Sequence, residues 1–179
     1  MLTGGRSSRF GSDKALYPVD GRAMALRVAD VLATLASRVT LVGHPARHRQ
    51  LGLPVIPDLM QGTGPLGGIV AALSNASSQW ILVAACDMPM LTKEPLERLL
   101  GEARRSDAAA ILPRTPDGRL QPLCAAYARR ALGPLESELK AGTRKITQAL
   151  QSVAWTALDV EDTRPFLNLN RKGELSGLD

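Results

Sequence analysis

Two patterns of hydrophobic and polar positions alternate along this chain. In residues 22–36 the apolar positions share one helical face: Met24, Val28, Val31, Leu32 and Leu35. Residues 80–85 instead form a short, uninterrupted apolar run, which is typical of a strand buried on both faces. Because such segments alternate along the chain, we expect an α/β fold with three layers, α/β/α. Its doubly wound, mostly parallel sheet would be covered by helices on both sides.

The same two patterns predict the remaining elements. Strands are expected at residues 38–42, 53–56, 80–85, 108–112, 123–127, 154–160 and 165–168. Helices are expected at residues 22–36, 66–74, 92–105, 128–140 and 145–151, with Thr92 as an N-cap and a brief helix at the C-terminal end. A turn-forming sequence at residues 115–118 joins two strands, which predicts a small antiparallel part. No internal repeat or linker interrupts residues 1–179, so we expect a single domain over 1–179.

Composition and charge narrow the class of ligand. The chain is 45% hydrophobic and 22% charged, which is ordinary for a soluble globular protein. Aromatic residues make up only 3%, too few to stack the bases of a single-stranded nucleic acid. The net charge of +5 favours anionic ligands, but the basic residues are scattered rather than clustered. We therefore expect small anionic substrates and no nucleic acid.

Cysteine usage and hydropathy indicate the compartment. Cys86 and Cys124 lie far apart and form no C-x-x-C pair, so reduced, structural thiols are expected. No apolar run is long enough to cross a membrane, and the opening residues are polar where a signal peptide has its apolar region. The sequence therefore predicts a cytoplasmic protein without a membrane partner.

A glycine-rich and basic segment opens the chain. Its glycines allow tight turns and close approach of the backbone to a ligand, and its cations suit a polyphosphate: Gly4, Gly5, Arg6, Arg9, Gly11 and Lys14. The spacing differs from that of a Walker A loop, and a flexible basic tail is the alternative. A phosphate loop usually follows a buried strand, but only Met1 and Leu2 precede Thr3. Either the sequence begins late or the first strand is short.

Two aspartates follow predicted strands. Ligand sites in open α/β sheets lie beyond the carboxyl ends of the strands, and Asp87 comes directly after the apolar run that ends at Cys86. A carboxylate there can hold Mg²⁺ together with substrate phosphates. Asp58 ends the preceding strand, and its two acceptor oxygens could select guanine, which presents adjacent N1–H and 2-amino donors. For both residues the alternative is a turn or capping aspartate.

Three further patterns leave alternatives open. Residues 62–67 match G-x-G-x-x-G with Asp87 twenty residues beyond Gly67, as in a dinucleotide fingerprint, although no strand directly precedes them. We prefer another role for residues 64–68: their glycines would let the backbone pass close beside a nucleotide, and this segment would lead into a helix. His44 and His48 have metal-pair spacing, but Pro45 and the missing third ligand favour a surface loop or an early helix. Asn168 and Asn170 alternate with leucines, which would place both amides on one face of a strand.

Taken together, these residues resemble the molybdenum cofactor guanylyltransferase family. The matching pieces occur in the family's order and span nearly the whole chain: residues 2–15, 57–58, 64–68, 86–89, 121–123 and 166–170. The first piece and the Asn-x-Asn ending are the most specific. The resemblance implies a fold of the nucleotide-diphospho-sugar transferase type. It also implies transfer of GMP from GTP to molybdopterin with Mg²⁺ as cofactor, release of pyrophosphate, and molybdoenzymes or their chaperones as further partners.

The resemblance also implies roles for individual residues. Leu2, Thr3, Gly4 and Gly5 would contact the guanine nucleotide, with Lys14 on the phosphates. Asp58 would read guanine and Asp87 would hold the metal. Arg9 falls on a position linked to the phosphate loop, and Asn168 and Asn170 fall on positions tied to the pterin side. The catalytic set expected from the resemblance is therefore Arg9, Lys14 and Asp87.

This sequence departs from the family's pattern at two places, and both concern the expected contacts with the guanine base more than those with the phosphates. The family often has alanine where Thr3 stands, and it tends to carry an asparagine near Val42 and Gly43. Within the enzyme class the alternative is a cytidylyltransferase acting on the same pterin, and the alternative without catalysis is a nucleotide- or pterin-binding carrier.

Overall fold

The first residues of the chain join two groups of strands into one sheet. Leu2 pairs in parallel with Val42 on one side and with Ala85 on the other. Its neighbours are β3 (Leu41–Gly43) and β5 (Trp80–Ala84), both supplied by later parts of the chain. Residues 1–3 therefore form a short central strand between β3 and β5.

The computed structural model describes residues 1–3, 13–58 and 63–170, and a mixed sheet spans this part of the chain. Across the sheet the strands follow the order β4 (Val55–Pro57), β3, residues 1–3, β5, β7 (Cys124–Ala128), β6 (Ala110–Arg114) and β8 (Trp155–Asp159). Among these, β7 runs antiparallel to both of its neighbours, and the other pairings are parallel. The predicted mostly parallel sheet with a small antiparallel part is confirmed.

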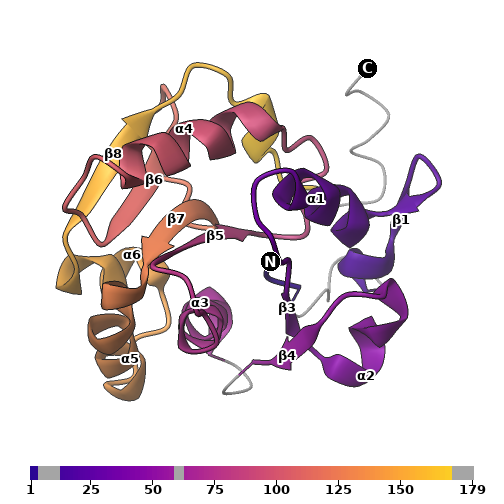
Figure 1. Ribbon diagram of the computed structural model, residues 1–179, viewed down its shortest axis with the longest axis horizontal. Coiled ribbons are helices and arrows are strands. Elements are labelled where there is room, and N and C mark those ends of the chain that lie inside the picture. Colours follow the sequence, from indigo (N-terminus) through magenta and orange to yellow (C-terminus); the bar gives the residue numbers. More distant parts are fainter. Residues whose placement is uncertain (4–12, 59–62, 171–179) are drawn as a thin grey trace.

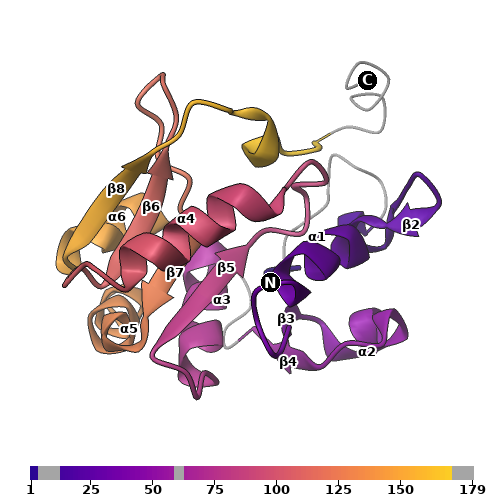
Figure 2. The same ribbon diagram turned by 45° about the horizontal axis from the view of Figure 1, so that its top comes forward.

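Helices cover both faces of the sheet (Figures 1 and 2). On one face lie α1 (Met24–Ala33) and α4 (Lys93–Ala103), and on the other lie α3 (Gly64–Ser74), α5 (Leu132–Lys140) and α6 (Ile146–Ala149). Successive strand residues point to opposite faces, so Ile111 packs in the core beneath α4 while its neighbour Leu112 packs in the core beneath α3. This explains the unbroken apolar runs of inner strands such as β6, which have core on both sides.

Shorter elements complete the described chain. They are α2 (Pro45–His48), a hairpin of β1 (Pro18–Val19) and β2 (Arg22–Ala23), and the 3₁₀ turns η1 (Lys14–Leu16), η2 (Arg49–Leu51), η3 (Arg129–Ala131), η4 (Leu150–Ser152) and η5 (Arg164–Phe166). The hairpin was not predicted, although its turn is a strong signal. Asp20 and Gly21 have φ of 49° and 74°, the two positive values that an Asp-Gly type I′ turn requires.

The strand predicted at residues 165–168 is wrong. Residues 164–166 form η5 instead, in which Phe166 N–H bonds to Thr163 O and Leu167 N–H bonds to Arg164 O, each at 3.1 Å. Pro165 suits the first turn of a helix because its fixed φ is helical and its missing N–H has no partner to lose there. The brief C-terminal helix expected beyond residue 170 lies outside the described residues. Within the described part, none of the helices combines the length and apolar character needed to cross a bilayer.

Candidate active site

Three side chains from distant parts of the chain meet at the carboxyl end of β5. Lys14 Nζ lies 3.1 Å from Asp87 Oδ2 and donates to Asn170 Oδ1 at 2.9 Å. The side chains of Lys14 and Asp87 are 18% and 23% exposed, so both remain accessible to a ligand. A cation, a carboxylate and an amide at the end of a central parallel strand match the position where open α/β sheets bind ligands. The contact joins the lysine at the end of the basic opening segment to the aspartate after β5, and the roles expected of the two residues stay predictions.

Local structure aims Lys14 at Asp87. Asp13 is the N-cap of η1, and its Oδ1 accepts the N–H of Ala15 at 3.0 Å. Ala15 is fully buried, which anchors the turn against the core. Lys14 lies between this cap and this anchor, so the backbone that carries it is held on both sides.

Asn170 reaches the site because the chain after η5 is tied to Asp87. Leu169 N–H donates to Asp87 O at 2.8 Å, and the Leu169 side chain is buried against Val19 and Met24. Asn168 and Asn170 flank this buried leucine and are both exposed. Leu167, the other leucine of the pattern, is 42% exposed, so the expected alternation is present only around Leu169, and residues 167–170 form no strand. Asn170 contacts Lys14, whereas Asn168 contributes its backbone oxygen to Asn170 Nδ2 at 3.4 Å.

Asp58 lies beyond β4, beside the start of α3. A Cβ at Gly67 would lie 3.0 Å from Asp58 Oδ1, and Thr63, 1% exposed, touches the same position. A Cβ at Gly68 would likewise lie 3.0 Å from the Leu2 side chain. The glycines of α3 therefore let the helix approach the end of β4 and the central strand closely. This fits the prediction that the glycines of residues 64–68 allow a close approach of the backbone in a segment that leads into a helix.

The other predicted contacts divide into two groups. Gly4, Gly5 and Arg9 lie outside the described residues. Thr3 is buried, and its hydroxyl lies 2.9 Å from His48 Nδ1 and donates to Val42 O at 3.0 Å. The structure therefore shows Thr3 in a protein hydrogen-bond network, and its contact with a nucleotide stays a prediction.

The sequence analysis favoured a surface loop or an early helix for the two histidines, and it gave His48 no role in the site. The helix is present, since His48 is the last residue of α2. His44 is exposed, but His48 is only 2% exposed, and its Nε2 lies 3.0 Å from Asp13 Oδ2. The described residues contain no group of three or more His, Cys, Asp or Glu side chains that could hold a metal. Pro45 at the start of α2 was the available signal, because it begins a one-turn helix whose last residue faces inward.

The thiol beside the site is chemically inert. Burial raises the pKa of Cys86 to about 12, and the nearby charges of Asp87 and Asp13 act in the same direction. Burial also raises the pKa of Cys124 to about 12. Both are free cysteines, and neither supplies a thiolate nucleophile near neutral pH.

Comparison with known proteins supports one family. The model of the MobA-like NTP transferase domain matches residues 1–154. A protein of Pelotomaculum thermopropionicum named "Probable molybdenum cofactor guanylyltransferase" is 36% identical, over 98% of this chain and 88% of its own length. One of Pyrococcus furiosus with the same name is 34% identical, over 99% of this chain and 94% of its own.

A solved structure agrees with this match over nearly the whole fold. The molybdopterin-guanine dinucleotide biosynthesis protein A of Archaeoglobus fulgidus superposes with a TM-score of 0.84 at 28% identity, covering 98% of this chain and 93% of that one. The fold is therefore of the nucleotidyltransferase type, as expected. The chain belongs to the MobA-like NTP transferase family.

Proposed function

We propose that this protein transfers GMP from GTP to molybdopterin and releases pyrophosphate. The observation that carries the proposal is the contact of Lys14 with Asp87 and Asn170 at the end of β5. This contact supports the proposal because a lysine beside a carboxylate suits a polyphosphate with its metal ion, and the chain belongs to a nucleotidyltransferase family. The relatives named as guanylyltransferases match almost the full chain, which supports this particular transfer.

The reaction needs charge neutralisation more than proton transfer. The attacking group is the terminal phosphate of molybdopterin, which is already anionic at neutral pH, so no general base has to activate it. The barrier is the approach of two anions and the charge that builds on the departing pyrophosphate. Phosphoryl-type transfer depends mostly on positioning and electrostatic stabilisation. In this proposal Lys14, assisted by Arg9, neutralises the leaving group.

The site has a suitable donor for Mg²⁺. Asp87 offers a partly exposed carboxylate, the hard oxygen ligand that Mg²⁺ prefers. Mg²⁺ in nucleotide-binding sites is commonly held by one or two carboxylates together with substrate phosphates. When bound, Mg²⁺ would neutralise charge on the phosphate oxygens. Asp87 would hold the ion, and Lys14 would keep that carboxylate oriented.

The two substrates are assigned to opposite sides of this centre. Asp58, beside the start of α3, accepts the N1–H and 2-amino donors of guanine, while Leu2, Thr3, Gly4 and Gly5 complete the nucleotide side. Asn170 and Asn168 lie on the pterin side, where their amides can bond to polar groups of molybdopterin. Asn170 touches Lys14 directly, so it also links the pterin side to the phosphate side.

Substitution of Lys14 by alanine tests the proposal. Removing the cation deprives the transition state of one electrostatic partner, so kcat for pyrophosphate release should fall about 10²- to 10³-fold. The fold should survive because the Lys14 side chain is not fully buried. Lys93→Ala is the matched control, since it removes an exposed, ion-paired lysine of α4 and should leave kcat unchanged.

The assay contains GTP, Mg²⁺ and molybdopterin, with CTP in place of GTP in a parallel reaction. Pyrophosphate from GTP supports the guanylyltransferase, and greater turnover of CTP would replace it by the cytidylyltransferase alternative. Binding of nucleotide or pterin without pyrophosphate would favour a carrier. Unchanged turnover by Lys14→Ala would contradict the role of Lys14.

A further inference from the structure

His48 connects the two stretches of chain that border the basic opening segment. His48 is the last residue of α2, and its side chain is almost completely buried. Its Nδ1 lies 2.9 Å from Thr3 Oγ1, and its Nε2 lies 3.0 Å from Asp13 Oδ2. Thr3 directly precedes residues 4–12 in the sequence and Asp13 directly follows them. One imidazole ring therefore binds the residues on either side of that segment.

The hydrogen bonds around the ring assign its proton. The backbone N–H of His44 points to Nδ1 at 3.3 Å, so Nδ1 is an acceptor. The neutral ring then carries its proton on Nε2 and donates it to the Asp13 carboxylate. The Thr3 hydroxyl lies between two acceptors, Nδ1 and Val42 O. Both ring nitrogens are thus engaged with groups of the protein.

Gly43 provides the space for this ring. A Cβ at residue 43 would lie 2.7 Å from His48 Nδ1 and 2.9 Å from its Cε1, and it would also collide with Thr3 Oγ1. Any larger residue at the end of β3 would displace the ring or the hydroxyl. Gly43 stands near the position where the resembled family tends to carry asparagine. The glycine and the buried histidine are therefore matched to each other in this chain.

The network leads to the phosphate lysine. Asp13 uses one oxygen for His48 and the other to cap η1, the turn whose first residue is Lys14. Lys14 in turn contacts Asp87. We propose that His48 is a positioning residue for the transfer reaction: it orients Asp13 and, through the capped turn, aims Lys14. This inference depends on the proposed function for its role in catalysis, but the positioning of Lys14 can be measured separately.

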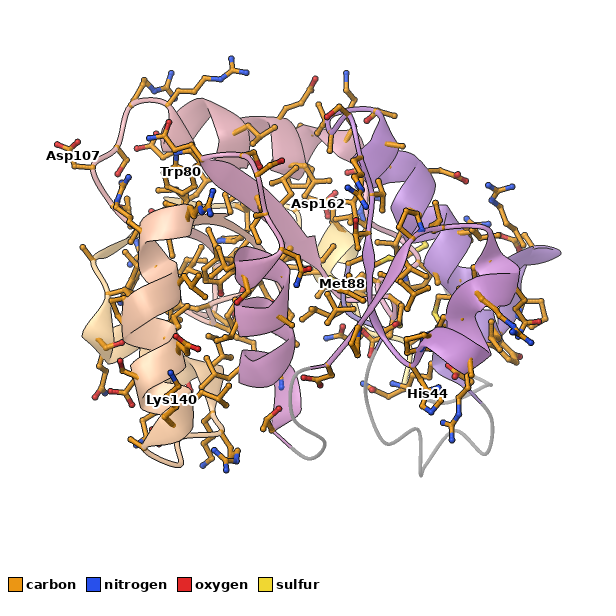
Figure 3. The ribbon with its side chains drawn as sticks, turned by 60° about the horizontal axis from the view of Figure 1, so that its bottom comes forward. His44, Trp80, Met88, Asp107, Lys140 and Asp162 are labelled. Atoms are coloured by element: carbon orange, nitrogen blue, oxygen red, sulfur yellow. The ribbon has the colours of Figure 1, made fainter. Side chains whose placement is uncertain are left out.

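Three variants test the effect on turnover. His48→Leu keeps an apolar side chain of similar reach and removes both hydrogen bonds, so kcat should fall about 10- to 100-fold, the cost of a small misplacement of a catalytic group. The KM for molybdopterin should change less than about threefold, since His48 does not touch the pterin side. His48→Gln keeps a donor toward Asp13 and should recover most of the lost kcat. His44→Ala is the control, because His44 lies exposed at the edge of the molecule (Figure 3) and should keep wild-type kcat.

A double substitution separates positioning from general damage. If His48 acts through Lys14, then His48→Leu should lower kcat by less than about twofold in a Lys14→Ala background. A purely structural role would lower kcat by the same factor in both backgrounds, and this result would overturn the inference. Should His48→Leu fail to fold, Asp13→Ser serves in its place, because serine keeps the N-cap of η1 but is too short to reach His48 as well.

Chemical labelling of lysines gives a readout that requires no turnover. With limiting acetic anhydride, Lys14 should react at least about threefold faster in His48→Leu, since a displaced amine leaves its contacts with Asp87 and Asn170 and meets the reagent more often. Lys93 in the same molecules is the internal reference and should not change. Absence of pyrophosphate from the wild-type enzyme would defeat the proposed function alone. Unchanged Lys14 labelling in a folded His48→Leu or Asp13→Ser variant would defeat the positioning role.

Discussion

At the scale of single residues, the pairing of Lys14 with Asp87 prepares the site for a charged substrate. Lys14 is held by two oxygens, one from Asp87 and one from Asn170, so its long side chain is already ordered. Ordering such a side chain costs up to about 2 kcal/mol of rotamer entropy, which is then not lost when the nucleotide binds. A phosphate oxygen that approaches Lys14 arrives next to the carboxylate assigned to Mg²⁺. Cation and metal ligand are therefore organised together.

Asp58 gives a prediction about the choice of base. An asparagine keeps one acceptor but presents an amide donor to one of guanine's two donors. Loss of one charge-assisted hydrogen bond should lower kcat/KM for GTP about 10- to 100-fold in Asp58→Asn. The value for CTP should change less than about threefold, because cytosine does not present the same pair of donors. Steady-state assays with both nucleotides measure the ratio.

The control for this prediction is Asp107→Asn, which removes an exposed carboxylate at the edge of the molecule (Figure 3). It should leave both values unchanged. If Asp58→Asn kept the wild-type ratio of GTP to CTP, then Asp58 would be a turn residue, the alternative that the sequence also allowed.

The candidate site could be predicted from the sequence where a residue's chemistry and its place after a strand pointed the same way. Asp87 is such a residue, and Lys14 was indicated by the glycine-rich, basic segment that carries it, whereas Asn170 was named only through the family resemblance. The structure brings all three together. His48 could not be found in this way. Its importance comes from Gly43 and Thr3, which are distant in sequence and leave room for the ring only in the folded protein. Spacing along the chain carries no information about such a cavity.

At the scale of elements, α3 depends on glycine at the positions facing the site. A Cβ at Gly67 would collide with the Thr63 hydroxyl and lie 2.8 Å from Thr63 Cβ. Gly67→Ala should therefore destabilise the protein by about 1–3 kcal/mol, the usual cost of overpacking. It should also lower GTP turnover, because Asp58 is the next neighbour. Urea unfolding gives the free energy of unfolding, and the pyrophosphate assay gives the turnover.

Gly101→Ala in α4 is the matched substitution. The nearest atom to its new Cβ would be the Arg105 guanidinium at 3.8 Å, an ordinary contact. Alanine is favoured over glycine inside a helix, so Gly101→Ala should stabilise by about 0.5–1 kcal/mol. Equal effects of the two substitutions would show that helix propensity, and not close packing at Gly67, controls both positions.

Helices and strands long enough to show a hydrophobic periodicity were predicted well. Short elements, whose conformation depends on local backbone geometry, were predicted poorly. The strands of the sheet and the long helices appear at their expected places, with boundaries shifted by a few residues. Residues 165–168 failed because a run of four residues containing proline is too short to separate a strand from a 3₁₀ turn. The missed hairpin shows the reverse case. The Asp20-Gly21 turn indicates a hairpin, but β1 and β2 have too few residues to show an alternation of apolar and polar positions.

At the scale of the whole molecule, topology explains why distant segments share one site. Residues 1–3, β3, β4 and β5 run in parallel, so their carboxyl ends meet at one edge of the sheet. Lys14, Asp58 and Asp87 all follow these strands in the sequence. The mostly parallel fold could therefore be used to predict that the opening segment and Asp87 would come together. The contact of the C-terminal Asn170 required the ordered path after β8, which no pattern in the sequence specifies.

The two cysteines buried within the sheet allow local opening of the fold to be measured. Cys86 and Cys124 are buried in the same core, and their raised pKa values of about 12 leave little thiolate at pH 8. Ellman's reagent should therefore label either thiol about 10³-fold more slowly than an unburied cysteine, with the rate rising about tenfold per pH unit.

Cys86 adjoins the site, whereas Cys124 lies within β7 opposite Ala84. GTP with Mg²⁺ should slow the labelling of Cys86 in Cys124→Ala more than that of Cys124 in Cys86→Ala, because ligands resist openings at their own site. Rapid labelling of either thiol without denaturant would contradict the buried core, and equal protection of both would mean that the sheet opens only as one unit.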